Sequence, residues 1–256
     1  MMRPLIHPDE IEDLPRPIVT LANDYAHGHV IARHRHRRAQ LVYASAGVLT
    51  VATAAGAWVV PPQRAVWVPA LTEHRVRAQG RVSMRSLYIE PDAAPGLPAE
   101  CCVVTVPPLL RELILAAMEF PRLYALDGPE ARVVAVILDQ IRAARIAPLH
   151  LPMPADARLR SVTEALVAAP GDDRTLAAWA AHAGASGRTL ARLFLRETGM
   201  TFRQWRRQAR LLAALTRLAT GEPVTTVALD LGYDSPSAFI AMFRKALGET
   251  PGRYFS

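Results

Sequence analysis

The sequence predicts two domains of different class: an N-terminal β-barrel followed by helices, and a C-terminal all-α domain built from a repeated unit. Three observations lead to this prediction. Short strand-like runs separated by close turns fill residues 18–106, the hydrophobic period becomes helical from Pro107, and the chain after Asp156 is helical with an internal repeat. With 256 residues, the chain is long enough for each domain to have a hydrophobic core.

The N-terminal region, residues 1–106, is expected to form the barrel. Its strand-like runs are rich in Val, Tyr and Trp and end at Gly, Pro or Ala-Gly: HVIAR, QLVYA, GVLTVAT, AWVV, RAVWVP, EHRVRA and MRSLYIE. Seven or more such runs within about 90 residues are typical of a β-barrel or a β-sandwich.

Two helices and a linker are expected next. Apolar residues recur at helical spacing in two stripes, which are Leu110, Leu113, Ile114 and Ala117, then Val133, Val134, Ile137, Leu138 and Ile141. Pro129 fits the first position of the second helix. We assign residues 107–146 to this helical region. The segment 147–156 has three prolines in ten residues and is assigned to a linker, and residues 157–256 form the last domain.

Charge and cysteine content narrow the class of protein. Of the net charge of +7, most lies in residues 151–256, which carry 14 basic against 9 acidic side chains. Such an excess indicates a polyanionic partner. No apolar run approaches the ~20 residues that a membrane helix needs, and a proline-rich N-terminus of mixed charge predicts no signal peptide. The two cysteines are adjacent, so no disulfide framework is expected and a cytoplasmic location fits best.

The internal repeat has a period of 49 residues. Leu190, Leu193 and Phe194 recur as Phe239, Met242 and Phe243, and Gly199 and Thr201 recur as Gly248 and Thr250. Two copies of one helix-turn-helix unit are the natural interpretation.

In the first copy, Gly184 suits a left-handed turn after a short helix, and Ser186 suits the N-cap of the next. Arg188, Thr189 and Arg192 then face outward, which is the arrangement that reading of the DNA major groove requires. Arginine can bind guanine through two hydrogen bonds, and Ser186 can contact phosphate.

In the second copy, Gly232 forms the turn, Ser235 is the N-cap and Pro236 takes the first helical position. The outward residues proposed for DNA contact are Ser237, Ile240 and Arg244. Because the front of this helix offers little bidentate base reading, sequence specificity is expected to lie mainly with the first copy. The long helix between the copies carries further candidate phosphate contacts, which are Arg206, Arg207 and Arg210.

Three segments resemble the AraC/XylS family of transcription regulators over about residues 172–255: the LARLF run, RRQARLLAALTRLATG and VALDLGYDSPSAFIAMFRKALGETPGRYF. The resemblance implies two recognition helices held about one DNA turn, ~34 Å, apart. It also implies double-stranded promoter DNA, a small-molecule effector and RNA polymerase as partners. A homodimer is expected, with residues 107–146 as the dimerisation region and the helix at 129–146 as the favoured element. At least one of the two apolar stripes is expected to pack instead against the barrel of its own chain. The alternative to a DNA-binding role for residues 172–255 is a helical scaffold whose glycines and aromatic residues serve only packing.

Histidines in the strand region form a second pattern. His34 and His36 are two apart, so on one strand they face the same side, and Gln40 and His74 follow. The spacing resembles the two cupin motifs, with Gln40 where metal-binding members often carry Glu and Leu71 in place of a glycine. The stretch VVPPQRAVWVPALTEH further resembles the branch of the AraC family that includes a nitroimidazole-responsive efflux regulator.

The cupin resemblance implies a divalent metal, Zn, Ni, Fe or Mn, bound by His34, His36, Gln40 and His74. A solvated strand, or a barrel that binds an organic effector without metal, remains the alternative. Aromatic side chains either belong to the core or line an effector pocket, and the candidates are Tyr43, Trp58, Trp67 and Tyr88.

The leading functional hypothesis is a regulator whose barrel senses a small molecule or metal and whose last domain binds promoter DNA. The rival hypothesis is a metal-dependent cupin enzyme, a dioxygenase or isomerase, fused to a DNA-binding domain. No further acid–base pair lies near the histidines in the sequence, so we expect no enzyme activity. A third hypothesis, a nucleoid-type DNA binder, predicts equal binding to any duplex.

Overall fold

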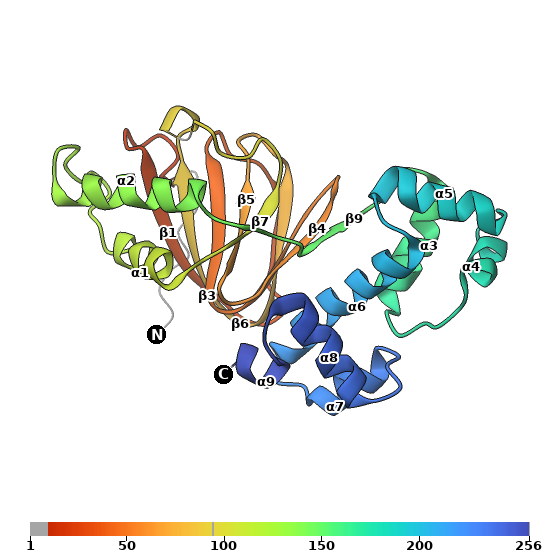
Figure 1. Ribbon diagram of the computed structural model, residues 1–256. Helices are drawn as coiled ribbons and strands as arrows, with labels where there is room; N and C mark the ends of the chain where they lie inside the picture. The colour runs from red at the N-terminus through yellow and green to blue at the C-terminus, as the bar shows by residue number, and fades with distance from the viewer. Residues whose placement is uncertain (1–9, 94, 256) are drawn as a thin grey trace. The chain divides into compact units, whose positions relative to one another are not determined.

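The computed structural model describes residues 10–93 and 95–255 (Figure 1). Part of the N-terminal stretch for which we expect no signal peptide therefore lies outside the described residues. The chain forms two compact units, the first up to Leu149 and the second from His150 onward, with Ala54–Ala57 grouped with the second. Among the described helices, none is long and apolar enough to cross a membrane.

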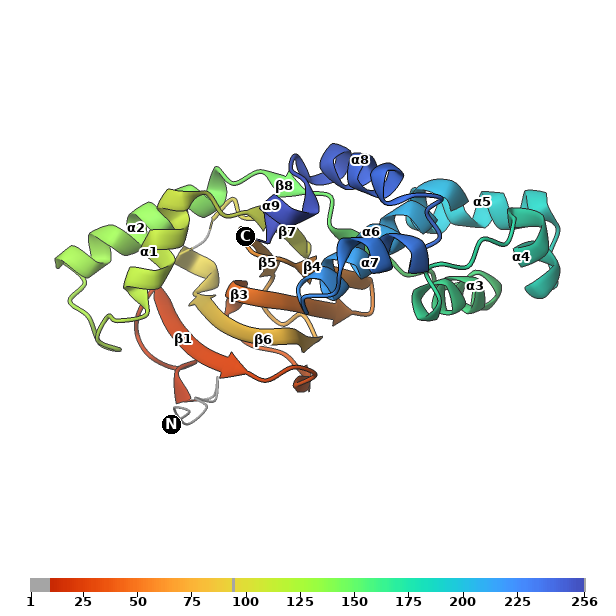
Figure 2. The same ribbon diagram turned by 90° about the horizontal axis from the view of Figure 1, so that it is seen from below.

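The described strands form one nine-stranded sheet, shown from below in Figure 2. Along the main path the order is β1-β6-β3-β5-β7-β8, while β2 pairs with β6, and β4 pairs with β3 and β9. The bounds are β1 Ile18–Tyr25, β2 Val30–His34, β3 Ala39–Thr53, β4 Gly56–Val60, β5 Arg64–Val68, β6 His74–Ile89, β7 Cys102–Thr105, β8 Ile146–Ala147 and β9 His150–Pro152.

The seven expected runs all fall in strands, but they do not form seven separate strands. QLVYA and GVLTVAT join into β3, and EHRVRA and MRSLYIE join into β6. These two long strands pair with each other, and their register shifts between Ala44 and Ala46 and again between Ala46 and Val48. The expected turns are therefore irregularities inside continuous strands, which bend a sheet without ending it.

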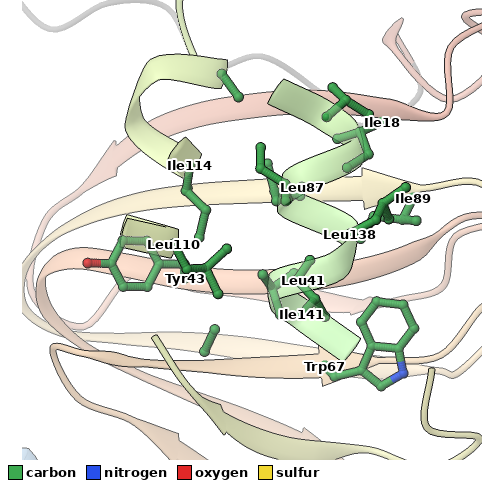
Figure 3. Packing of buried hydrophobic residues seen from close by; sticks show 14 of the residues in the cluster. Ile18, Leu41, Tyr43, Trp67, Leu87, Ile89, Leu110, Ile114, Leu138 and Ile141 are labelled. Atoms are coloured by element: carbon green, nitrogen blue, oxygen red, sulfur yellow. The ribbon is translucent and has the colours of Figure 1, made fainter. Parts of the chain in front are cut away.

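Helices α1 (Pro108–Ala117) and α2 (Pro129–Arg142) cover one face of the sheet. Their apolar stripes pack onto alternate residues of the strands, such as Leu41 and Tyr43 of β3 (Figure 3). Four of the five stripe residues of α2 are enclosed in this core at no more than 8% exposure, and Val133 is partly buried against it; the four are Val134, Ile137, Leu138 and Ile141.

This burial corrects the expectation that the stripe of the second helix joins two subunits. Helical periodicity of apolar residues reports that a face is buried, and it does not identify the surface that buries it. Here the surface is the sheet of the same chain.

The second unit is helical: α3 Ala157–Ala168, α4 Leu176–His182, α5 Gly187–Thr198, α6 Phe202–Leu218, α7 Val224–Asp230, α8 Pro236–Leu247 and α9 Pro251–Tyr254. The repeat is visible in the hydrogen bonds of both turns. Gly184 and Gly232 have φ of 62° and 73°, and each donates to the carbonyl three residues earlier. The next residue in each turn donates to the carbonyl five residues earlier, which completes a Schellman motif in both copies.

Residues 147–156, expected as a linker, include the end of β8 and all of β9. Side chains of the helical unit hold this segment. The Trp205 indole N–H donates to the carbonyl of Pro152 at 2.9 Å. One carboxylate oxygen of Glu197 accepts the backbone N–H groups of Ala155 and Asp156, at 3.0 and 2.9 Å.

Candidate nucleic-acid interface and histidine cluster

Helix α5 presents the side chains that the sequence assigns to base reading. The hydroxyl of Ser186 accepts the backbone N–H of Thr189 at 3.1 Å and forms a second bond to its hydroxyl at 2.9 Å. Leu190 on the opposite face is fully buried. Arg188 and Arg192 are exposed, and neither forms an ion pair within the described part of the chain. Their guanidinium groups are therefore available to an anionic ligand.

Helix α8 is capped in the same way as α5 and exposes a less polar surface. The hydroxyl of Ser235 accepts the backbone N–H of Ala238 at 3.2 Å, and Phe239 is fully buried. Ser237 and Arg244 are exposed and Ile240 is half-buried. This surface offers one hydroxyl, one aliphatic chain and one cation.

The three arginines assigned to phosphate on α6 do not have equivalent surroundings. Arg207 is exposed. Arg206 is half-buried and donates to the carbonyl of Arg174 at 3.0 Å. Arg210 turns inward instead, and its guanidinium donates to four backbone carbonyls at 2.9 to 3.3 Å. Four of the five N–H donors of Arg210 are thus used inside the unit, so a phosphate contact by Arg210 stays a prediction and has fewer donors available than one by Arg207.

Three histidines converge at one side of the sheet. One ring nitrogen from each of His34, His36 and His74 lies within 4.8 Å of the other two. His34 stands opposite His74 in the pairing of β2 with β6, and their ring centroids are 4.3 Å apart. The prediction that His34 and His36 share one strand is wrong, because β2 ends at His34. The ring of His36 nevertheless lies beside that of His34, with 4.7 Å between the ring centroids.

Hydrogen bonds orient two of these rings. Nδ1 of His34 is 2.7 Å from the carbonyl of Ala32, and Nδ1 of His74 is 2.9 Å from that of Thr72. Because a carbonyl can only accept, Nδ1 carries the proton in each ring. Burial, opposed by the Thr72 hydrogen bond and aided by His34, lowers the pKa of His74 from 6.5 to about 4. The ring is therefore neutral at pH 7, and its Nε2 keeps a lone pair.

Gln40 completes the cluster. Its amide nitrogen donates to the hydroxyls of Ser86 and Tyr88 at 3.1 and 2.9 Å, which directs the amide oxygen toward Nε2 of His74, 3.1 Å away. Two lone pairs then face each other. Two ligand atoms on one tetrahedral zinc would be separated by about 3.4 Å, given bonds near 2.1 Å. The separation of this pair is therefore close to what a divalent cation requires, and each of the three histidines offers one ring nitrogen as a ligand.

The four candidate pocket aromatics divide between two environments. Tyr88 lies beside the histidines, with its ring centroid 4.9 Å from that of His36. Tyr43 and Trp67 instead belong to the core beneath α1 and α2 (Figure 3). For these two residues the structure favours the first of the alternatives that the sequence left open, the core, because they occupy the other face of the pleat from the histidines. Trp58 is buried and lies outside that core cluster.

Sequence reasoning missed Ser86, which is fully buried and holds the amide of Gln40. The sequence does contain a pattern from which this role could have been inferred. Ser86 is two residues before Tyr88, so the two side chains face the same side of β6.

Two family models match separate parts of the chain. Residues 16–144 match the model of the AraC-like ligand binding domain, and residues 179–256 match a helix-turn-helix domain. The regulator NimR of Escherichia coli K12, an HTH-type transcriptional regulator, is 40% identical over 223 residues, which are 87% of this chain and 81% of NimR. RipA of Corynebacterium glutamicum, another HTH-type transcriptional regulator, is 36% identical over 103 residues, which are 40% of this chain and 31% of RipA.

Among solved structures, the DNA-binding domain of AdpA in complex with a target DNA is 31% identical, covering 38% of this chain and 89% of that domain with a TM-score of 0.37. The family models and the extent of the match to NimR are sufficient for assignment. The chain belongs to the AraC family of transcription regulators, with an N-terminal ligand-binding domain and a C-terminal helix-turn-helix DNA-binding domain.

Proposed function

We propose that this regulator binds two half-sites of promoter DNA, one with α5 and one with α8, in the cytoplasm and together with RNA polymerase. The observation that carries the proposal is a pair of capped helices, α5 before α6 and α8 after it, each preceded by a turn with the same hydrogen-bond pattern. The first half-site supplies most of the sequence discrimination, because only α5 presents two exposed arginines at base-reading positions.

Operator selection tests this division. Duplexes selected by the full-length protein from a random library would be scanned by single base-pair substitution at fixed salt. We expect losses of about 1–3 kcal/mol at the best positions under α5 and smaller losses under α8. Equal losses in both half-sites would contradict the asymmetry. Equal affinity for selected and random DNA would instead indicate a nucleoid-type binder.

We further propose that the histidine cluster binds a divalent metal, Zn, Ni, Fe or Mn, and that the ligand-binding domain uses it to sense an effector. His34, His36 and His74 would hold the metal through ring nitrogens, and Gln40 through its amide oxygen. The bound metal would supply an open coordination position for the effector. The carbonyls of Ala32 and Thr72 support this role, because ligating histidines commonly donate their second N–H to such a partner.

Elemental analysis of the purified protein tests the metal. Stoichiometric metal in the wild type, lost in His34→Ala, His36→Ala and His74→Ala, is expected. His182→Ala is the matched control, since His182 is exposed in the helical unit and should leave the metal content unchanged. A wild type that contains no metal, and takes up none of the four offered, would exclude the site. The fact that the relatives are named as transcriptional regulators favours sensing over catalysis.

A homodimer is retained as a proposal on a different surface. Leu123 and Leu126, between α1 and α2, are 59% and 61% exposed, and Val136 on α2 is 42% exposed. Exposed apolar side chains of this size favour a protein contact. Sedimentation should therefore detect a dimer that Leu126→Glu weakens, and a wild type that is monomeric at high concentration would refute the proposal.

A further inference from the structure

One arginine of α6 contacts both helix-turn-helix copies. The guanidinium of Arg210 donates through Nε to the carbonyl of Pro170 at 2.9 Å, and through Nη2 to those of Gly171 and Asp172, both at 3.3 Å. These three residues lead into the first copy. Through Nη1 the same group donates to the carbonyl of Gly232 at 3.3 Å, in the turn of the second copy.

The backbones that meet at Arg210 are in close contact. A Cβ added to Gly171 would lie 2.1 Å from the carbonyl oxygen of Asp230. A Cβ added to Gly232 would lie 2.8 Å from both the carbonyl oxygen of Gly171 and Nη2 of Arg210. Neither position can therefore accept a side chain, and the entry to the first copy and the turn of the second are packed backbone to backbone.

We infer that Arg210 is a positioning residue that fixes the separation of the two recognition helices, and thereby the spacing of DNA half-sites that the protein accepts. The inference rests on the proposed binding of two half-sites. The planar guanidinium has five donors in a rigid fork, so it can satisfy carbonyls of both copies at once. A lysine ammonium at the same place keeps the charge and loses the fork.

The consequence for DNA follows from the geometry of the double helix. One base pair inserted between half-sites moves the second about 3.4 Å along the axis and rotates it by about 34°. If the two copies are fixed to each other, this change breaks one set of contacts. If the joint at Arg210 is released, the copies can adjust and the insertion costs less.

The experiment compares four full-length proteins: wild type, Arg210→Met, Arg210→Lys and Arg207→Met. Each binds a duplex selected by the wild type and the same duplex with one base pair inserted or deleted between the half-sites, and fluorescence anisotropy gives the affinities. For the wild type we expect a loss of tenfold or more on insertion. For Arg210→Met and Arg210→Lys the loss should fall below threefold. Arg207→Met, which removes an exposed arginine one turn away, should keep the full loss and bind both duplexes more weakly.

The outcomes separate the two levels of the argument. A wild type that tolerates the insertion would refute binding to two half-sites and the inference with it. A wild type that is sensitive to the insertion, together with folded Arg210 variants that are equally sensitive, would overturn the positioning role alone. If Arg210→Met does not fold, Arg210→Lys and Arg210→Gln supply the same comparison.

Discussion

Replacing Ile137 with Ala tests where the apolar stripe of α2 is buried. Ile137 is fully buried among the residues that join α2 to the sheet, while its neighbour Val136, about 100° around the helix, is 42% exposed. Ile137→Ala and Val136→Ala therefore remove apolar carbon from adjacent positions, the first inside the core of the chain and the second on its surface.

The expected magnitude follows from the volume removed. Ile137→Ala deletes three carbons, worth about 2.4 kcal/mol at ~0.8 kcal/mol each, and the cavity left behind raises the cost toward 3 kcal/mol. With a denaturant slope near 2 kcal/mol per molar urea, the unfolding midpoint should fall by about 1.5 M. Because Val136 lies outside the core, Val136→Ala should change the free energy of unfolding of the monomer by no more than about 0.5 kcal/mol.

Hydrogen exchange measured by mass spectrometry across a urea series is the appropriate assay, because it follows sheet peptides separately from those of α3–α9. The loss of protection should be confined to the sheet and to α1 and α2. Should Ile137→Ala unfold like the wild type, with no loss of protection in the sheet, Ile137 would not be packed in the core of the chain and our account of that core would be wrong.

Three further predictions concern single side chains. Arg188→Ala and Arg192→Ala should each cost about 1–3 kcal/mol on a selected operator and much less on random DNA, and normal binding by both would mean that α5 faces elsewhere. The N–H of Asp156 is the largest influence that lowers the pKa of Glu197 from its ordinary 4.5. At neutral pH the wild type should therefore have a free energy of unfolding about 1 kcal/mol larger than that of Glu197→Gln, and this difference should decrease as the pH falls below 4.5. A difference in the free energy of unfolding that does not change with pH would count against the prediction. Leu71 has φ of 62°, so Leu71→Gly should be more stable than Leu71→Ala by about 1 kcal/mol in thermal unfolding, and the reverse order would show that the turn relaxes.

The parts of the fold that depend on neighbours in sequence were predictable. The N-caps Ser186 and Ser235 and the turn glycine Gly184 all have the predicted roles, because each role is determined within about four residues. Leu71 illustrates the same point. The cupin motif carries a glycine there, and the leucine adopts the left-handed conformation that glycine favours.

Features that depend on distant partners were not predictable. The sequence predicts strands from Ile18 onward, but the extension of β1 through Asn23 and Asp24 is not evident from these turn-type residues; Asn23 is 6% exposed and donates to the hydroxyl of Tyr25. The role of Arg210 was missed because its carbonyl partners are 22 to 40 residues away. The histidine cluster lies between these cases. Motif spacing identified His34, His36 and His74, but the strand register decided how they meet.

The hydrogen bonds from Trp205 and Glu197 to the segment before α3 bear on how this protein can be divided. A DNA-binding fragment cut at the helix boundary, Ala157, would leave the indole N–H of Trp205 and the carboxylate of Glu197 without their backbone partners. A fragment that begins at His150 keeps both. The DNA-binding unit that can be joined to another sensor domain is therefore longer than its helices. It includes the extended segment from His150 to Asp156, which its prolines led us to expect as a linker.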